Sequence, residues 1–141
     1  MNKSLSTQSI VHLVMEVLKI LERVHASGFI FCDLKLDNIL LGEGQTLPNQ
    51  RFDPERNVFE NASLHLIDFG FATRFQDRET GEHLPQVSTE LFQGNLIFSS
   101  LNQLKFKSLS RRDDLISLGY MMSFMLLGGK LPGINLDAKM N

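Results

Sequence analysis

Two apolar triplets, residues 29–31 and 39–41, enclose a short polar run, and this arrangement constrains the fold more than any other feature of the chain. Each triplet is long enough only for a brief strand, so residues 32–38 are predicted to form a loop between two strands. A third strand is predicted over residues 63–67, and it ends at Asp68. The fold should therefore present the polar side chains of the loop and Asp68 at the ends of short strands.

An amphipathic helix is predicted before this loop, because apolar residues recur at steps of three and four positions. These residues are Ile10, Val14, Val17, Leu21 and Val24. Ser6, Thr7 or Ser9 can cap the start of the helix, and Gly28 marks its end.

A second helix is predicted near the end of the chain. Ser110 and Asp113 have the spacing of a capping box, with Asp in place of the usual Glu, and an apolar run begins at Leu115. The run is apolar almost all round, so the helix should be buried on most faces. Gly128 and Gly129 end it.

Loops are predicted for two long segments. Residues 42–61 are polar and contain several glycines and prolines, which indicates an exposed loop. Residues 71–107 show no sustained period and should be largely irregular. So long an irregular segment is uncommon in a compact domain unless it is functional.

Composition indicates one soluble domain. With 141 residues, 43% apolar and 21% charged, the chain can build a hydrophobic core. Its net charge of −2 gives no electrostatic argument for binding nucleic acid or an anionic membrane. Cys32 is the single cysteine, which excludes an internal disulfide, and the longest apolar stretch, residues 115–127, is too short to span a bilayer. We expect a cytoplasmic protein, with a nuclear location as the alternative.

The polar residues of the loop suit phosphoryl transfer, which depends on positioning and on neutralising charge. Asp33 can accept the proton of an attacking hydroxyl, and Lys35 can offset charge on the transferred phosphate. Asn38 and Asp68 carry the oxygen ligands that Mg²⁺ prefers. Their spacing, with Asp-Phe-Gly at residues 68–70, resembles the catalytic loop and metal-binding motif of protein kinases. The resemblance implies ATP, contacted through Lys35, Asn38 and Asp68, together with Mg²⁺.

The chain also resembles one branch, the casein kinase 1 family, over nearly its whole length. The matching segments are residues 29–38, the pattern Asp77…Thr80…His83-Leu84-Pro85, Gly94 with Ser100-Leu101-Asn102, and residues 110–120, the most specific block. The resemblance implies a serine/threonine protein kinase that acts on protein substrates. It also implies an α+β, protein-kinase-like fold: a mainly helical C-terminal lobe with short β-hairpins. By the same match, Asp114 anchors the backbone of the catalytic loop through hydrogen bonds, whereas Asp113 is explained as a carboxylate favoured by the helix dipole.

Residues 1–141 are expected to form a partial protein kinase domain, with the N-terminal lobe absent. Nothing before Ile10 resembles the glycine-rich loop, the strand lysine that holds the phosphates, or its glutamate partner. The expected parts are the helix before the catalytic loop, the loop, Asp-Phe-Gly, the activation segment and a buried central helix. We expect such a chain to be inactive alone.

Several positions depart from the family pattern. The His-Arg that precedes the catalytic Asp in typical members is Phe31-Cys32 here. Three positions that are basic in typical members are Thr73, Glu90 and Ile97. In the family, these basic residues help to bind the phosphate of a pre-phosphorylated substrate, so the sequence predicts that this anion site is missing.

The alternative interpretation is a non-catalytic pseudokinase or protein-binding fragment. Phe31, Cys32 and the missing N-terminal half favour it. Intact residues at all four candidate positions oppose it: Asp33, Lys35, Asn38 and Asp68. The sequence leaves the protein substrate and the oligomeric state open.

Overall fold

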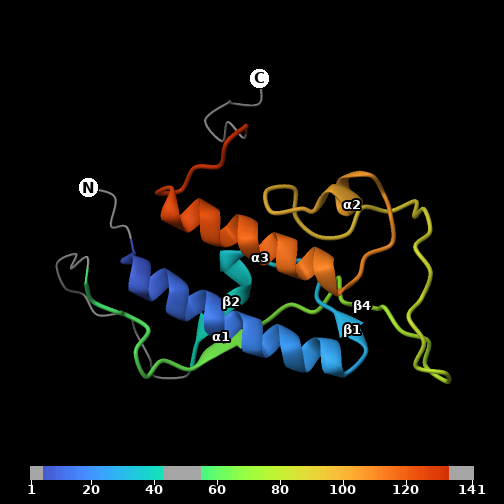
Figure 1. The fold of residues 1–141 in the computed structure, drawn as a ribbon, viewed down its shortest axis with the longest axis horizontal. Coiled ribbons are helices and arrows are strands. Elements are labelled where there is room, and N and C mark those ends of the chain that lie inside the picture. Colours follow the sequence, from blue (N-terminus) through green and yellow to red (C-terminus); the bar gives the residue numbers. More distant parts are fainter. Residues whose placement is uncertain (1–4, 43–54, 134–141) are drawn as a thin grey trace.

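The computed structural model describes residues 5–42 and 55–133, so most of the predicted 42–61 loop lies outside the described residues. Two long helices, α1 (Thr7–Ala26) and α3 (Arg111–Leu126), lie side by side and run in opposite directions (Figure 1). Short strands and irregular segments pack around this pair. The elements are helices and short antiparallel strands, as predicted.

Both helices have the ends that the sequence predicts. Among the three possible caps of α1, Ser6 is used: its side chain accepts a hydrogen bond from the Ser9 amide at 3.1 Å. At α3, the Asp113 carboxylate accepts a hydrogen bond from the Ser110 amide at 2.8 Å. The Gly129 amide then donates to a carbonyl of the last helical turn, and its φ of +88° suits glycine. The capping signals were therefore sufficient to locate both helices.

The strands form two separate two-stranded sheets. β1 (Phe29–Ile30) pairs with β4 (Thr73–Arg74), and β2 (Ile39–Leu41) pairs with β3 (Leu64–Leu66), both antiparallel. The three predicted strands are confirmed, and β4 was not predicted. The loop between β1 and β2 ends in a 3₁₀ turn, Leu36–Asn38, so this loop is held at both ends by hydrogen-bonded strands.

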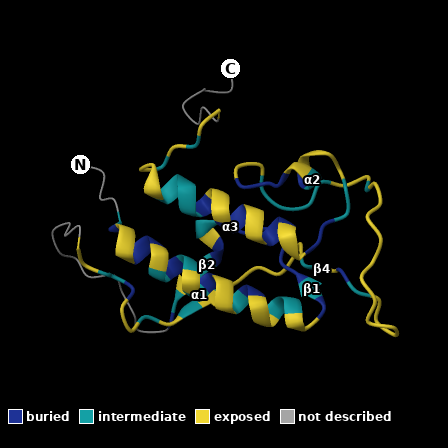
Figure 2. Cartoon of the chain, in the orientation of Figure 1, coloured by how far each residue is buried: buried dark blue, intermediate teal, exposed yellow. Residues whose placement is uncertain are grey.

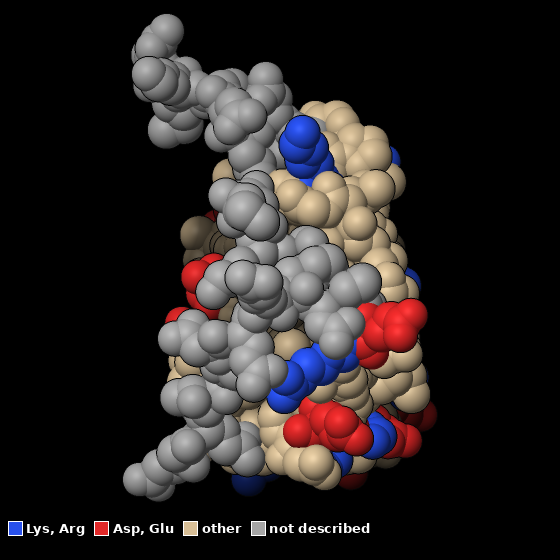
Figure 3. Space-filling model, turned by 90° about the vertical axis from the view of Figure 1, so that its left-hand side faces the viewer, with Lys and Arg blue, Asp and Glu red and all other residues tan. Residues whose placement is uncertain are grey.

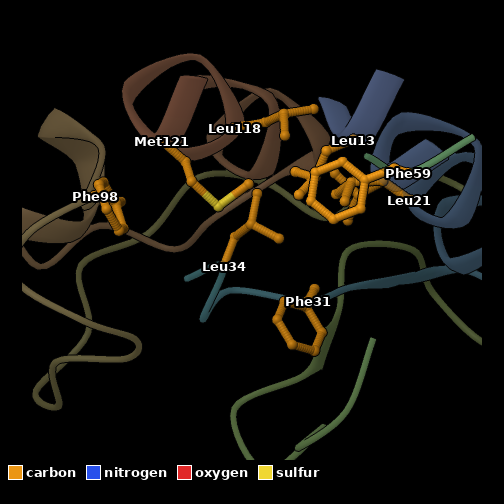
Figure 4. Packing of buried hydrophobic residues seen from close by; sticks show 9 residues of the cluster. Leu13, Leu21, Phe31, Leu34, Phe59, Phe98, Leu118 and Met121 are labelled. Carbon is orange, nitrogen blue, oxygen red and sulfur yellow. The ribbon is translucent and has the colours of Figure 1, made fainter. Parts of the chain in front are cut away.

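The main core lies between the two helices and the loop. Leu34 is fully buried, and Figure 4 shows it pointing toward Met121 of α3, with Leu13 and Leu21 of α1 and Phe59 also in the cluster. Burying one such leucine contributes about 1.5–3 kcal/mol. Because neighbouring side chains of an extended segment point to opposite sides, the burial of Leu34 turns the adjacent polar side chains away from this core.

The predicted burial of α3 on most faces is confirmed for one face only. Its buried positions include Leu118 and Met121, whereas Leu115 and Tyr120 are exposed (Figure 2). An all-round apolar pattern carries no information about which side meets a neighbour. Within the described residues, α1 and the loop cover one side of α3, and the other side faces solvent.

The segment from residue 71 to residue 107 is largely irregular, as predicted, but it contains β4 and a four-residue helix, α2 (Leu101–Leu104). Ser100 and Gln103 form a reciprocal capping box at the start of α2. The sequence analysis did not predict α2, although the Ser-x-x-Gln spacing is a recognised signal of a helix start.

No helix in the described part of the chain is long and apolar enough to cross a bilayer. Figure 3 shows the end of the molecule where α1 begins, and on its described atoms acidic and basic side chains are interspersed.

Candidate active site

Asp114 of α3 holds the start of the loop between β1 and β2 through hydrogen bonds to its backbone. The two oxygens of this buried carboxylate accept hydrogen bonds from the Phe31 and Cys32 amides, each at 2.8 Å. His25, at the end of α1, places its Nε2 atom 2.7 Å from the same carboxylate. Cys32 has a φ of +69°, a left-handed conformation that costs a non-glycine residue about 1–2 kcal/mol. The predicted anchoring by Asp114 is thus present, and it supports a strained turn just before Asp33.

Asp33 is 1% exposed, and three side chains surround its carboxylate. Oδ2 lies 3.1 Å from the amide nitrogen of Asn38 and 3.0 Å from Lys35 Nζ. Oδ1 accepts a hydrogen bond from the Asn95 amide nitrogen at 3.1 Å. Asn95 also donates to the Leu34 carbonyl at 3.0 Å. The sequence analysis missed Asn95, since nothing local shows that it reaches a residue 62 positions earlier.

Asp68 lies next to Asn38 because β2 and β3 pair. The Ile67 amide donates to the Asn38 carbonyl at 2.9 Å, directly after the last pair of the ladder. Asp68 is exposed, has a φ of +62°, and accepts a hydrogen bond from the Gly70 amide through Oδ1 at 3.2 Å. The hydrogen bond that Lys35 donates to Asp33 raises the pKa of Lys35, and the charges of Asp33 and Asp68 raise it further. All four predicted residues are therefore neighbours.

The donor set fits a magnesium ion shared with a phosphate ligand. The Asn38 amide nitrogen donates to Asp33, and the Asp68 carboxylate accepts from Gly70 through Oδ1. Among the described residues, the Asn38 amide oxygen and Asp68 Oδ2 are therefore left to bind a metal ion. In the described ranges, no group of three or more His, Cys, Asp and Glu residues could hold a metal ion by itself. Two protein oxygens suit Mg²⁺, which usually keeps several waters and binds substrate phosphates.

An apolar contact joins the two motifs. The rings of Phe31 and Phe69 meet edge to face, with centroids 5.1 Å apart and planes at 80°. Such pairs contribute about 0.5–1.5 kcal/mol beyond burial alone. Phe31, in place of the family's histidine, therefore keeps an apolar contact with the Asp-Phe-Gly segment.

Gln103 of α2 connects the segment before α2 to the loop between β1 and β2 through hydrogen bonds. The Gln103 amide nitrogen donates to the carbonyls of Cys32 and Gln93, at 2.9 and 2.8 Å. Gly94 has a φ of +106°, and a Cβ atom there would lie 2.4 Å from the Cys32 carbonyl oxygen. Asp113 accepts from Ser100 Oγ at 2.7 Å, so its role extends beyond capping α3. These contacts bring Asn95 to Asp33.

Cys32 is a packed, neutral thiol. It is 4% exposed, and burial, with a smaller contribution from Asp114, raises the pKa of its thiol well above the ordinary value. A raised pKa removes the reactive thiolate. A cation, such as the arginine of typical members, is therefore replaced by an uncharged side chain beside the candidate base.

A separate groove lies beside the start of α3, with a volume of about 720 Å³. Its lining includes Met15, Leu18 and Leu115, and none of the four candidate residues contributes to it. The candidate site around Asp33 therefore lies outside this groove.

The comparisons with known proteins agree with this geometry. The model of the protein kinase domain matches residues 1–138. The chain belongs to the protein kinase family. Similar proteins are "Casein kinase I homolog RAG8" of Kluyveromyces lactis, 34% identical over 96% of this chain, and "Casein kinase I homolog 1" of Saccharomyces cerevisiae, 32% identical over 99%. "Casein kinase 1-like protein HD16" of Oryza sativa is 30% identical over 92%.

These relatives confirm the resemblance to the casein kinase 1 family. This kinase-family chain spans 23% of the length of each of the two yeast relatives, and 17% of the rice protein.

Proposed function

We propose that the protein is a serine/threonine protein kinase of casein kinase 1 type, and that this chain supplies the core of its C-terminal lobe. The observation that supports this most strongly is the arrangement of Asp33, a buried carboxylate surrounded by three oriented donors and next to two oxygen ligands. ATP and protein hydroxyl groups would be the substrates.

Asp33 would act as the base through Oδ1. A carboxylate oxygen has two acceptor positions. Oδ2 has two donors, from Asn38 and Lys35, whereas Oδ1 has one, from Asn95. One position on Oδ1 thus remains for the hydroxyl of a serine or threonine substrate. Asn95 would be a positioning residue, because it fixes the direction in which this oxygen faces.

Lys35 would be the cation on the phosphate side. Its side chain is 32% exposed, so it can turn from Asp33 toward a phosphate bound above the loop. Since its pKa is raised, it stays charged at neutral pH. When Lys35 moves away from Asp33 Oδ2, the hydrogen bond from Asn38 to this oxygen would still hold the Asp33 carboxylate in place.

Asn38 and Asp68 would hold Mg²⁺ by their side-chain oxygens. A Mg²⁺ ion held there would supply positive charge to offset the negative charge that develops during phosphoryl transfer. The hydrogen bond from the Ile67 amide to the Asn38 carbonyl supports this proposal, because it holds Asn38 and the strand end before Asp68 side by side.

The second candidate is a pseudokinase that binds proteins without catalysis. The uncharged Cys32 favours it, because no side chain at that position can pair with an anion near the activation segment. Nucleotide binding that depends on Mg²⁺ separates the two functions, since a lobe that only binds proteins would show no such binding.

The direct experiment compares Asp33→Asn with Asp37→Asn in the protein as its cell makes it, because Asp37 is an exposed carboxylate of the same loop. Asp33→Asn should lower turnover by roughly 10²–10⁴-fold, the usual contribution of a positioned base. Asp37→Asn should leave turnover within about twofold. Full activity of Asp33→Asn would contradict the role of the base.

A further inference from the structure

Residues 87–104, named here the flanking segment, are almost without charge. They contain no lysine or arginine, and their single charged residue is Glu90. Yet the segment exposes large apolar side chains: Val87, Leu91, Leu96, Ile97, Leu101 and Leu104. Leu91 and Leu96 are 77% and 72% exposed, so they contact little else among the described residues.

The flanking segment passes directly beside the candidate base. Asn95 donates to Asp33 Oδ1, and Leu96 is the next residue, about 3.8 Å further along the backbone. An extended peptide advances about 3.4 Å per residue. A residue within about three positions of a hydroxyl at Asp33 can therefore reach Leu96 and Ile97.

The exposure of these side chains does not come from a loosely held backbone. Asn95 Oδ1 accepts from the Phe98 amide at 2.9 Å, and Phe98 is buried in the main core. Gln103 and Gly94 fix the segment against the Cys32 carbonyl. Because this apolar surface is already ordered, binding a peptide to it carries no further cost of ordering the surface itself.

We propose that the flanking segment binds the substrate peptide through a large apolar residue within about three positions of the acceptor serine or threonine. Acidic and phosphorylated flanking residues are disfavoured. This inference rests on the proposed function, and it names the class of substrate for that same site.

The distribution of charge supports the choice of peptide. Glu90 repels an acidic neighbour, and Thr73 and Ile97 are uncharged where typical members are basic. Lys105 and Lys107 follow the segment in the chain, and Lys107 Nζ is already 3.0 Å from Ser88 Oγ. Lys35 lies beside Asp33, but its proposed partner is the phosphate of ATP. An apolar residue loses nothing by leaving water here, whereas a carboxylate or phosphate loses hydration without gaining a cation.

The experiment uses the protein as its cell makes it and three peptides with the same acceptor, flanked by leucine, aspartate or phosphoserine. The leucine peptide should have a kcat/KM about tenfold above the aspartate peptide, which corresponds to burying roughly half of a leucine side chain. Leu96→Lys should abolish or reverse this order. The matched control Leu127→Lys, 53% exposed at the end of α3, should leave it unchanged.

Two results would overturn the inference: a preference for aspartate or phosphoserine, or equal effects of Leu96→Lys and Leu127→Lys. A large loss of folding stability in Leu96→Lys would also overturn it, because it would show that another part of the protein covers Leu96. Binding of labelled peptides is measured in parallel by fluorescence anisotropy. Transfer to all peptides without preference contradicts the inference alone, whereas selective binding without any transfer contradicts the proposed function alone.

Discussion

Replacing Asp114 by Asn tests how the loop between β1 and β2 is held. The carboxylate is 2% exposed and accepts hydrogen bonds from the Phe31 and Cys32 amides, with His25 Nε2 at 2.7 Å. An asparagine of the same shape keeps one acceptor oxygen. Its amide nitrogen would face one of these N–H groups, donor against donor, so that one buried amide loses its partner.

The expected loss of stability is about 3–5 kcal/mol. A hydrogen bond to a charged group contributes about 1.5–3 kcal/mol, and a buried amide without a partner costs about 1–3 kcal/mol. Where the amide that loses its partner is that of Cys32, the left-handed backbone of this residue adds to the loss. Small domains are stable by only about 5–15 kcal/mol, so Asp114→Asn should unfold a large fraction of the molecules under mild denaturant.

The assay is urea denaturation followed by circular dichroism, with Glu79→Gln as the control because Glu79 is exposed. The control should stay within about 0.5 kcal/mol of the unchanged chain. In Asp114→Asn, the Phe31 and Cys32 amides should also exchange hydrogen faster. A loss below about 1 kcal/mol, with both amides still protected, would refute the reasoning.

Three further predictions concern stability. Burial raises the pKa of the Cys32 thiol above 9.0, so the unfolded chain loses this proton first and stability falls as the pH rises above about 9. Cys32→Ala should remove up to about 1.4 kcal/mol per pH unit of this fall in urea titrations between about pH 8 and about pH 10, and equal slopes in both proteins would contradict it. Gly94→Ala should cost about 1–3 kcal/mol more than Gly81→Ala by thermal denaturation, because both have positive φ but only position 94 meets a carbonyl oxygen; equal losses would argue against the clash. Gly119→Ala, in α3 with nothing within 4 Å of the added Cβ, should stabilise by about 1 kcal/mol, and an unchanged urea midpoint would show that helix propensity does not decide there.

Local signals in the sequence were sufficient for much of the fold. The period of the apolar residues and the caps located both long helices within a residue or two. The apolar triplets gave β1 and β2, and the stretch before Asp68 gave β3. These features could be predicted because each depends on residues close together in the chain.

Long-range contacts could not be predicted in the same way. The pairing of β1 with β4 and the hydrogen bond from Asn95 to Asp33 join distant residues that carry no mutual signal. The exposed side of α3 was missed because an all-apolar helix does not indicate which neighbours are present. For Asp33, Lys35, Asn38 and Asp68, the geometry places the predicted groups together, and their roles remain predictions.

Asp113 and Asp114 are neighbours in one helical turn, about 100° apart around the axis, so they point in different directions. Asp114 holds the turn before Asp33, and Asp113 holds Ser100 in the segment that carries Asn95. The alignment of the candidate base, Asp33, with the flanking segment is therefore set by the rotation of α3 about its axis, and not by the lengths of the irregular segments that connect them. A change that twists the first turn of α3 would move both surfaces at once.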